Sequence, residues 1–194
     1  MLTDIRQALA ESIAVKQNVL NDGELIARIA RVVESCIAAF RSGNKIILAG
    51  NGGSAADAQH IAAEFVSRFQ FDRPGLPALA ITTDTSMLTA IGNDYGYERL
   101  FARQLEANGR PGDIFFGIST SGNSKNILAA LQTCQTMNIT AIGFSGAGGR
   151  ISEFCDTCIR IPSLSTPRIQ EAHITVGHII CGLVEAAMFE PQRS

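Results

Sequence analysis

The strongest constraint on the fold is a repeated change from short apolar runs to helix-forming segments, most clearly in residues 46–64. The apolar run 46–49 is rich in β-branched residues and too short for a helix, so it predicts a strand. Gly50, Asn51, Gly52 and Gly53 then break the chain. Ser54 stands where an N-cap is expected, ahead of an alanine-rich segment. The stretch therefore predicts a strand, a tight glycine loop and a helix.

The same alternation continues to the end of the chain. We expect strands near 45–49, 78–81, 114–118, 140–144 and 157–161, and helices near 54–69, 87–92, 99–107, 125–137 and 168–188, with a turn at 93–96. Alternating strands and helices predict a doubly wound α/β domain with a five-stranded parallel sheet covered on both faces. No linker or low-complexity segment interrupts the pattern, so we expect a single domain, 1–194.

Two further helices, about 2–20 and 24–40, precede the first strand. The earlier one carries an apolar stripe at Leu2, Ile5, Leu9 and Ile13, separated by polar residues. The segment 1–43 can either cover the sheet or contribute to an oligomer interface, and the sequence leaves both open.

Composition narrows the class of protein. The chain has 194 residues, of which 46% are hydrophobic and 18% charged, as in globular domains. The net charge is −2 and there is no basic stretch, which argues against wholesale binding to nucleic acid or to an acidic membrane surface. Asp4, Arg6 and Glu11 interrupt the N-terminal apolar pattern, so we expect no signal peptide. We see no apolar run of membrane-spanning length and expect a cytoplasmic protein with no membrane partner.

The five cysteines are an odd number and lie in apolar contexts. Cys155-x-x-Cys158 has the spacing of a redox or zinc motif, but no second CxxC and no adjacent histidine pair accompanies it. We therefore interpret the cysteines as buried free thiols in a reducing compartment.

Three predicted strands end in loops rich in glycine or hydroxyl groups: GNGGS, STSGNS and SGAGG. In doubly wound folds, ligands bind at the carboxyl ends of the strands. The middle loop places Ser119, Thr120, Ser121 and Ser124 before a helix, and hydroxyls with helix N–H groups suit a small phosphate monoester. Neither a GK[ST] motif nor GxGxxG is present, so ATP and NAD are disfavoured. The alternative is a hydroxyl-rich turn that only caps the helix.

The remaining candidates are histidines and a carboxylate. His60 and Glu64 lie at i and i+4, so they share a helix face as a metal pair, an acid–base pair or a plain surface pair. His173 and His178 are about 140° apart around the last helix and do not easily share a target. Gln170 and His178 are about 12 Å apart along that helix. Either Gln170 precedes the helix or groups from two subunits meet.

Several motifs together carry a family resemblance. GNGGSAADAQH-x3-E, TTD, GNDYG, GISTSGNS and RIQEAH-x4-H span almost the whole chain. In these motifs the chain resembles the sedoheptulose 7-phosphate isomerases (phosphoheptose isomerases) of the sugar-isomerase (SIS) domain family. The resemblance implies a flavodoxin-like five-stranded sheet and a homotetramer with active sites at subunit interfaces. It also implies conversion of the ketose to an aldose heptose 7-phosphate for lipopolysaccharide or related glycans.

The resemblance also implies residue roles. Glu64 and His178 match the acid–base pair, and a Zn²⁺ ion, one per subunit, would be held by His60, Glu64, Gln170 and His178. The implied substrate contacts, besides Glu64 and Gln170, are Asn51, Gly52, Gly53, Asn93 and Asp94, with Ser119, Thr120, Ser121 and Ser124 on the phosphate. His173 lies outside these sets, and we expect it to pack or to support the site indirectly.

Two rival functions are non-catalytic. One is that of a SIS-fold protein that resembles the DnaA initiator-associating proteins, tetramers that bind a replication initiator. The other is that of a sugar-phosphate sensor that binds without turnover. The initiator-binding relatives lack catalytic side chains, notably the carboxylate at the position of Glu64. The presence of His60, Glu64 and His178 therefore favours the enzyme.

Overall fold

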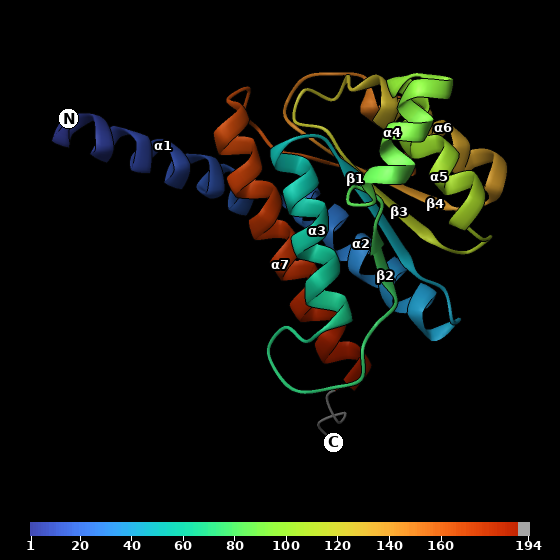
Figure 1. The fold of residues 1–194 in the computed structure, drawn as a ribbon. Helices are drawn as coiled ribbons and strands as arrows, with labels where there is room; N and C mark the ends of the chain where they lie inside the picture. The colour runs from blue at the N-terminus through green and yellow to red at the C-terminus, as the bar shows by residue number, and fades with distance from the viewer. Residues whose placement is uncertain (190–194) are drawn as a thin grey trace.

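Five parallel strands form one sheet in the order β2-β1-β3-β4-β5 in the computed structural model, which describes residues 1–189 (Figure 1). The strands are β1 (Ile46–Gly50), β2 (Ala78–Ala80), β3 (Ile114–Ile118), β4 (Thr140–Ser145) and β5 (Thr157–Arg160). All pairings are parallel, with Ile46 of β1 opposite both Ala78 and Ile114. This is the flavodoxin-like order, whose switch point lies between β1 and β3. The predicted fold class is confirmed.

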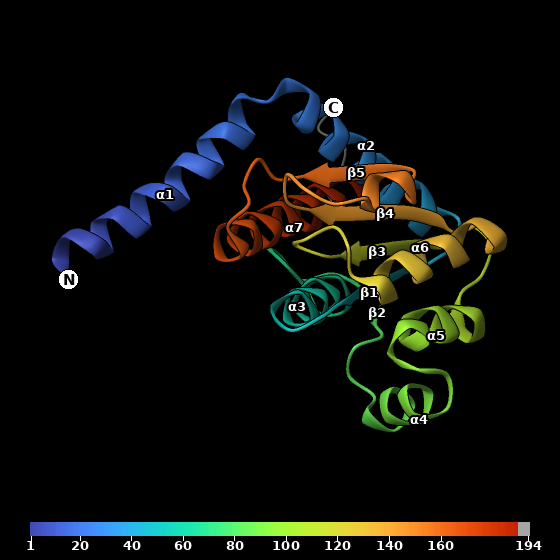
Figure 2. The same ribbon diagram turned by 90° about the horizontal axis from the view of Figure 1, so that it is seen from above.

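Successive strand residues face opposite layers of helices (Figure 2). Ile46 and Leu48 pack in a core with α2 (Gly23–Arg41), α3 (Gly53–Val66) and α7 (Thr166–Phe189). Ile47 and Ala49 face the other core, formed with α5 (Leu100–Asn108) and α6 (Lys125–Met137). Because both faces are covered, β1 and β3 are buried along their whole lengths, as expected for parallel strands.

The loop after β1 turns sharply into α3. Gly52 has φ of +56°, a conformation that favours glycine, and its carbonyl accepts the N–H groups of Ala55 and Ala56. Gly52 is therefore the N-cap, and the prediction that Ser54 caps this helix is wrong. Ser54 lies buried inside the first turn.

A second correction concerns the segment before α5. Helix α4 runs over Thr85–Tyr95, so Asn93 and Asp94 lie in its last turn rather than in a separate turn. The Asp84 carboxylate accepts the Met87 N–H at 2.9 Å and starts the helix earlier than expected. Gly96, with φ of +83°, ends it, and short 3₁₀ turns follow at Tyr97–Arg99 and, after β4, at Ile151–Glu153.

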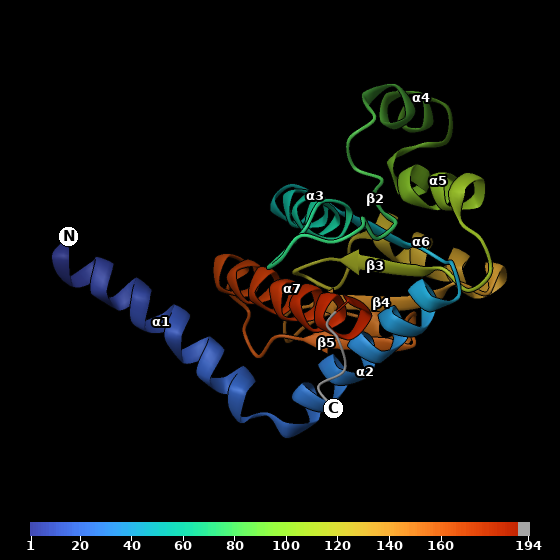
Figure 3. The same cartoon turned by 90° about the horizontal axis from the view of Figure 1, so that it is seen from below.

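Helices α3 and α7 lie side by side and run in the same direction (Figures 1 and 3). Gly53 faces Gln170 near their amino ends, Ile61 faces Gly177 midway, and Phe69, just beyond α3, faces Gly182. A β-carbon on Gly177 would come within 2.7 Å of the Ile61 side chain, so the helices approach closely there. This pair brings together residues more than 100 positions apart.

Helix α7 corrects one expectation from the sequence. It has 24 residues and a most apolar window with a mean hydropathy of 1.5, so by length and composition it could cross a membrane. Ile169, Val176, Ile180 and Val184 pack instead in the core formed with the sheet and α3, and the helix also buries His173 and Glu185, while Ile179 and Leu183 are exposed. The packing of this buried face accounts for much of the apolar composition.

The two N-terminal helices differ in what they cover. Helix α2 packs on the sheet, as one of the two alternatives proposed. Helix α1 (Leu2–Asn21) has no buried residue, and its N-terminal half projects from the body of the protein (Figures 1–3). Its stripe is exposed, with Leu2, Ile5, Leu9 and Ile13 exposing 77%, 51%, 60% and 66% of their surface.

The cysteines are free, and four of them are buried, with Cys155 half-buried. Burial raises the pKa of the Cys134 and Cys181 thiols to about 12, which makes them unreactive at neutral pH. The structure agrees with the prediction of free cysteines, and their burial is as predicted except at Cys155.

Candidate active site

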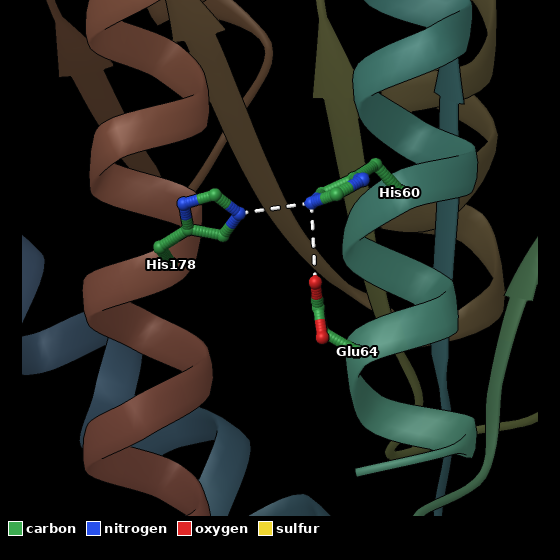
Figure 4. A group of neighbouring side chains, drawn as sticks. All are labelled: His60, Glu64 and His178. Atoms are coloured by element: carbon green, nitrogen blue, oxygen red, sulfur yellow. Dashed lines mark hydrogen bonds and ion pairs between the residues drawn. The ribbon is translucent and has the colours of Figure 1, made fainter. Parts of the chain in front are cut away.

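The helix pair brings three predicted ligands into one cluster (Figure 4). His60 and Glu64 project from successive turns of α3, and His178 projects from α7 toward them. The Nε2 atom of His60 lies 2.9 Å from Nε2 of His178 and 3.1 Å from Oε1 of Glu64. The three ligand atoms all lie within 4.8 Å of one another. The alternative of a plain surface pair does not account for this convergence.

The chemistry of the cluster fits a metal ion. Two imidazole nitrogens and one carboxylate oxygen form a set that Zn²⁺ takes in catalytic sites, where a fourth position stays open to water or substrate. The same atoms can exchange protons with a bound carbonyl compound, since imidazole and carboxylate are common general acids and bases. The Phe69 ring stacks on His178 with centroids 5.5 Å apart and limits its movement.

Gln170 lies away from this cluster, at the glycine loop. A β-carbon on Gly53 would come within 2.2 Å of Nε2 of Gln170, so the amide of this side chain lies directly against the glycine. Helix α7 begins at Thr166, so the idea that Gln170 precedes the helix is wrong. Within one chain, Gln170 stands beside the predicted sugar-binding loop, about two turns from His178.

The Asn51 side chain links the glycine loop to the next strand-end loop. Its amide and that of Asn126 bond reciprocally, at 3.0 and 2.9 Å, and the Tyr97 hydroxyl donates to Oδ1 of Asn51 at 2.8 Å. Asn126 is buried near the start of α6. Both lone pairs of Asn51 Oδ1 are used, so this side chain can offer a ligand only its second N–H. Asn126 and Tyr97 were missed from the sequence, because nothing local indicates such a long-range pairing.

The hydroxyl-rich loop converges on Ser119. Ser119 Oγ lies 2.9 Å from Ser124 Oγ and 3.4 Å from Ser121 Oγ, and Thr120 lies half-buried between them in the chain. Ser124 is the N-cap residue of α6, but its side chain makes no capping hydrogen bond. The capping alternative is therefore not supported. The hydroxyls bond one another and accept the N–H groups of Asn123 and Ser124 at the amino end of a helix, where an anion can replace these bonds.

Asn93 and Asp94 are exposed and pair with each other, the Asn93 amide donating to Asp94 at 2.8 Å. They lie four and three residues before Tyr97, whose hydroxyl donates to Asn51. The structure thus places them on the segment next to the glycine loop.

Two further polar side chains lie on the same pair of helices: Asp57 is half-buried on α3, and His173 is buried on α7. Burial raises the pKa of the Asp57 carboxyl to about 6, and in residues 1–189 its Oδ2 has no hydrogen-bond partner. His173 is buried against Phe144 with Nε2 3.1 Å from the Ser145 carbonyl, and burial lowers the pKa of this histidine to about 4. His173 is therefore neutral at pH 7 and packs in the core, as one of the two expected roles required.

The fold and the cluster together define a class of protein that comparisons with known proteins identify. The family model described as "SIS domain" matches residues 10–146. The chain is 63% identical to the phosphoheptose isomerase of Aneurinibacillus thermoaerophilus, over 95% of this chain and 94% of that protein. It is 62% identical to phosphoheptose isomerase 2 of Campylobacter jejuni, over 95% and 92%.

A solved structure agrees. Phosphoheptose isomerase GmhA from Neisseria gonorrhoeae matches with a TM-score of 0.89 and 39% identity, over 96% of this chain and 100% of that one. The chain belongs to the phosphoheptose isomerase family of SIS-domain proteins.

Proposed function

We propose that this chain converts D-sedoheptulose 7-phosphate to D-glycero-D-manno-heptose 7-phosphate through an enediol. The observation that carries the proposal is the convergence of His60, Glu64 and His178 on a chain of this family. The hydroxyl loop supports it, since β1 and β3 are neighbours and their loops are joined through Asn51 and Asn126. Such a site can hold the phosphate at one end of a sugar and the carbonyl at the other.

The reaction needs one base and one acid at adjacent carbons. A base removes a proton from C1 of the ketose while an acid protonates the C2 oxygen, which gives the enediol. The proton then returns to C2, and loss of the O1 proton leaves the aldehyde at C1. We assign these transfers to Glu64 and His178, worth roughly 10²–10⁴-fold each when positioned. Oε1 of Glu64 faces His60, which leaves Oε2 available for a proton.

We propose one Zn²⁺ ion per subunit, held by His60, Glu64 and His178 with Gln170 as a fourth ligand. When bound, the ion would polarise the substrate carbonyl or fix the side chains around it. Within its own chain, Gln170 lies against Gly53. For Gln170 to act as a ligand, either the Gln170 side chain of another subunit must reach the cluster or α7 must move. It can instead contact the sugar at the glycine loop.

We also propose a homotetramer with the sites at subunit interfaces. The exposed apolar stripe of α1 supports an association between copies, because monomeric proteins rarely leave such a stripe uncovered. We further propose that the protein acts in the cytoplasm, in the synthesis of lipopolysaccharide precursors. The proposal includes no nucleic-acid or membrane partner, in agreement with the small net charge of the chain.

The test is turnover of sedoheptulose 7-phosphate in D₂O by wild type and by Glu64→Gln. Wild type should form heptose 7-phosphate, and deuterium should appear at C2 wherever the base exchanges its proton with solvent before returning it to the enediol. Glu64→Gln should lose about 10²–10⁴-fold in kcat. Glu153→Gln is the matched control, since Glu153 is an exposed carboxylate paired with Arg150 away from the cluster.

Metal analysis should find about one Zn²⁺ per chain in the same preparation. Absence of turnover by wild type, with or without added Zn²⁺, would exclude the enzyme. Tight binding of the DnaA initiator would then favour the initiator-binding rival, and sugar-phosphate binding alone would favour the sensor. The relatives reported above carry the name of the enzyme and support neither rival.

A further inference from the structure

A buried ion pair links α3 and α7 at a point further toward their carboxyl ends than His60, Glu64 and His178. Arg73, in the connection between α3 and β2, and Glu185, on α7, expose 2% and 0% of their side chains. Arg73 Nε donates to Oε1 of Glu185 at 2.9 Å. Charged side chains are seldom buried so completely, and an ion pair removed from water rarely repays its desolvation.

The carboxylate holds the chain that leaves α3. Its two oxygens accept the N–H groups of Phe69, at 2.8 Å, and Gln70, at 2.7 Å. With Arg73, three donors therefore bind one carboxylate on α7. The segment just after α3 is fixed to α7 by charge-assisted hydrogen bonds, which are stronger than neutral ones.

The guanidinium holds the last turn of α3 itself. Nη2 of Arg73 donates to the carbonyl of Glu64 at 2.8 Å, and Nη1 donates to the carbonyl of Phe65 at 2.6 Å. The terminal carbonyls of a helix have no partner within the helix, and a cation there is favourable. The residue whose carbonyl Arg73 binds is the same Glu64 whose carboxylate enters the cluster.

The pair lies close to the cluster on both helices. Glu185 is seven residues, or about two turns, after His178. Arg73 and Glu185 thus connect the helix that carries His60 and Glu64 to the helix that carries His178. Sliding one helix along the other would separate the His178 ring from His60 and Glu64, and it would break the three hydrogen bonds to Glu185.

We infer that Arg73 and Glu185 are positioning residues that set the register between α3 and α7 and so hold Glu64 and His178 at working distance. The inference rests on the acid–base and metal roles proposed for the cluster. A purely structural pair would change stability and leave the properties of the cluster alone. The two cases are therefore separable by experiment.

The first variant is Arg73→Lys, which keeps the charge but loses the fork that bonds Glu185 and two carbonyls at once. We expect Zn²⁺ affinity, measured by competition with a chromophoric chelator, to fall about 10–100-fold, as for other groups that orient metal ligands. We expect kcat to fall with it and KM to change less than about threefold, since the phosphate loop lies elsewhere. Glu185→Gln should have the same effects.

The control is Lys45→Met, which removes the ion pair between Lys45 and the buried Asp113. These two residues precede β1 and β3, at the amino ends of the strands and away from the loops of the site. This variant should lose stability while Zn²⁺ affinity and kcat stay within about twofold of wild type. Folding is checked for every variant by circular dichroism. If Arg73→Lys folds and matches wild type in Zn²⁺ affinity and kcat, the inference is wrong.

A third readout needs neither metal nor turnover. The chain has three histidines, so ¹⁵N-histidine labelling gives few signals. In metal-free Arg73→Lys, the ring nitrogens of His60 and His178 should shift, because their 2.9 Å contact is altered, while those of the buried His173 should not. If wild type shows no Zn²⁺ binding or turnover, the proposed function fails, and this readout alone decides the inference. Unchanged His60 and His178 signals would then overturn it.

Discussion

Asn126 links the two loops that are proposed to bind the two ends of the substrate. Its amide is buried at the start of α6 and bonds Asn51 in the glycine loop. The hydroxyl loop ends at Ser124, two residues earlier. A single amide pair therefore fixes the distance between the two loops proposed to hold the phosphate and the sugar.

We predict that Asn126→Ala raises KM for sedoheptulose 7-phosphate by about 10–100-fold. The side-chain N–H of Asn51 would lose its acceptor while Tyr97 still donates to Oδ1, and a polar group left without its partner costs about 1–3 kcal/mol. Asn126→Asp should not restore activity, because a carboxylate cannot donate to Oδ1 of Asn51. Steady-state kinetics on purified variants is the measurement.

Asn123→Ala controls for this prediction. Asn123 lies in the same loop but is exposed, and its Oδ1 accepts the Arg150 N–H. It should leave KM within about twofold. Equal effects of the two alanine variants would show that the amide pair has no special role.

At the scale of elements, the α3–α7 contact depends on Gly177. Its Cα faces Ile61, and a β-carbon would lie 2.7 and 2.9 Å from two atoms of that buried side chain. With a β-carbon at position 177, either the Ile61 side chain must move or the two helices must separate. Either change would also displace His60, which is next to Ile61 in the chain and belongs to the cluster. The close approach is thus needed for the geometry of the site.

We predict that Gly177→Ala lowers the free energy of unfolding by about 1–3 kcal/mol, the usual cost of overpacking a core. Gly92→Ala, inside α4, has nothing within 4 Å of its β-carbon and should raise stability by about 0.5–1 kcal/mol, since alanine is the better helix former. Chemical denaturation of both variants compares them. A stabilised Gly177→Ala would mean that the helices are not packed closely here.

The elements also show what a sequence can predict. The β3 boundaries matched 114–118, because both ends of that apolar run are marked by polar residues or a turn. Helix α4 is longer at both ends than the predicted helix 87–92. It begins directly after the Asp84 cap, and it includes Asn93 and Asp94, which locally favour turns. His60 and Glu64 could be found from their spacing.

The remaining site contacts could not be found in this way. Arg73 and Glu185 are 112 residues apart and Asn51 and Asn126 are 75 apart. No local periodicity indicates such pairs, since they arise only when the strand order brings their elements together. The position of Gln170 against Gly53 depends on the relative placement of two helices for the same reason.

At the scale of the whole molecule, α1 is a helix whose apolar side chains are not buried by the rest of the chain. Val15 and Val19, toward its carboxyl end, pack against the core, and the Arg168 guanidinium donates to the Ala8 carbonyl at 2.6 Å. The apolar stripe from Leu2 to Ile13 is exposed. A helix of this kind gains most of its stability from packing against a partner.

We predict that wild type sediments as a tetramer at micromolar concentration and that the double variant Leu9→Asp/Ile13→Asp sediments as a smaller species. Two charges in an apolar interface are unfavourable unless they are paired. Gln7→Glu places its charge at an already exposed polar position of the same helix and should leave the mass unchanged. A tetrameric double variant would exclude this stripe from the interface.

The parallel course of α3 and α7 has an electrostatic consequence. Each helix has a partial positive charge at its amino end and a partial negative charge at its carboxyl end, so side-by-side parallel helices place like charges together. At the carboxyl end of α3, Arg73 compensates for the negative potential. At the amino ends, beside Gly53 and Gln170, the potential is positive and favours the oxygen atoms of a bound sugar. The amino end of α6 has the same effect on a phosphate at the hydroxyl loop, so the polarity of the backbone is favourable at both ends of the substrate.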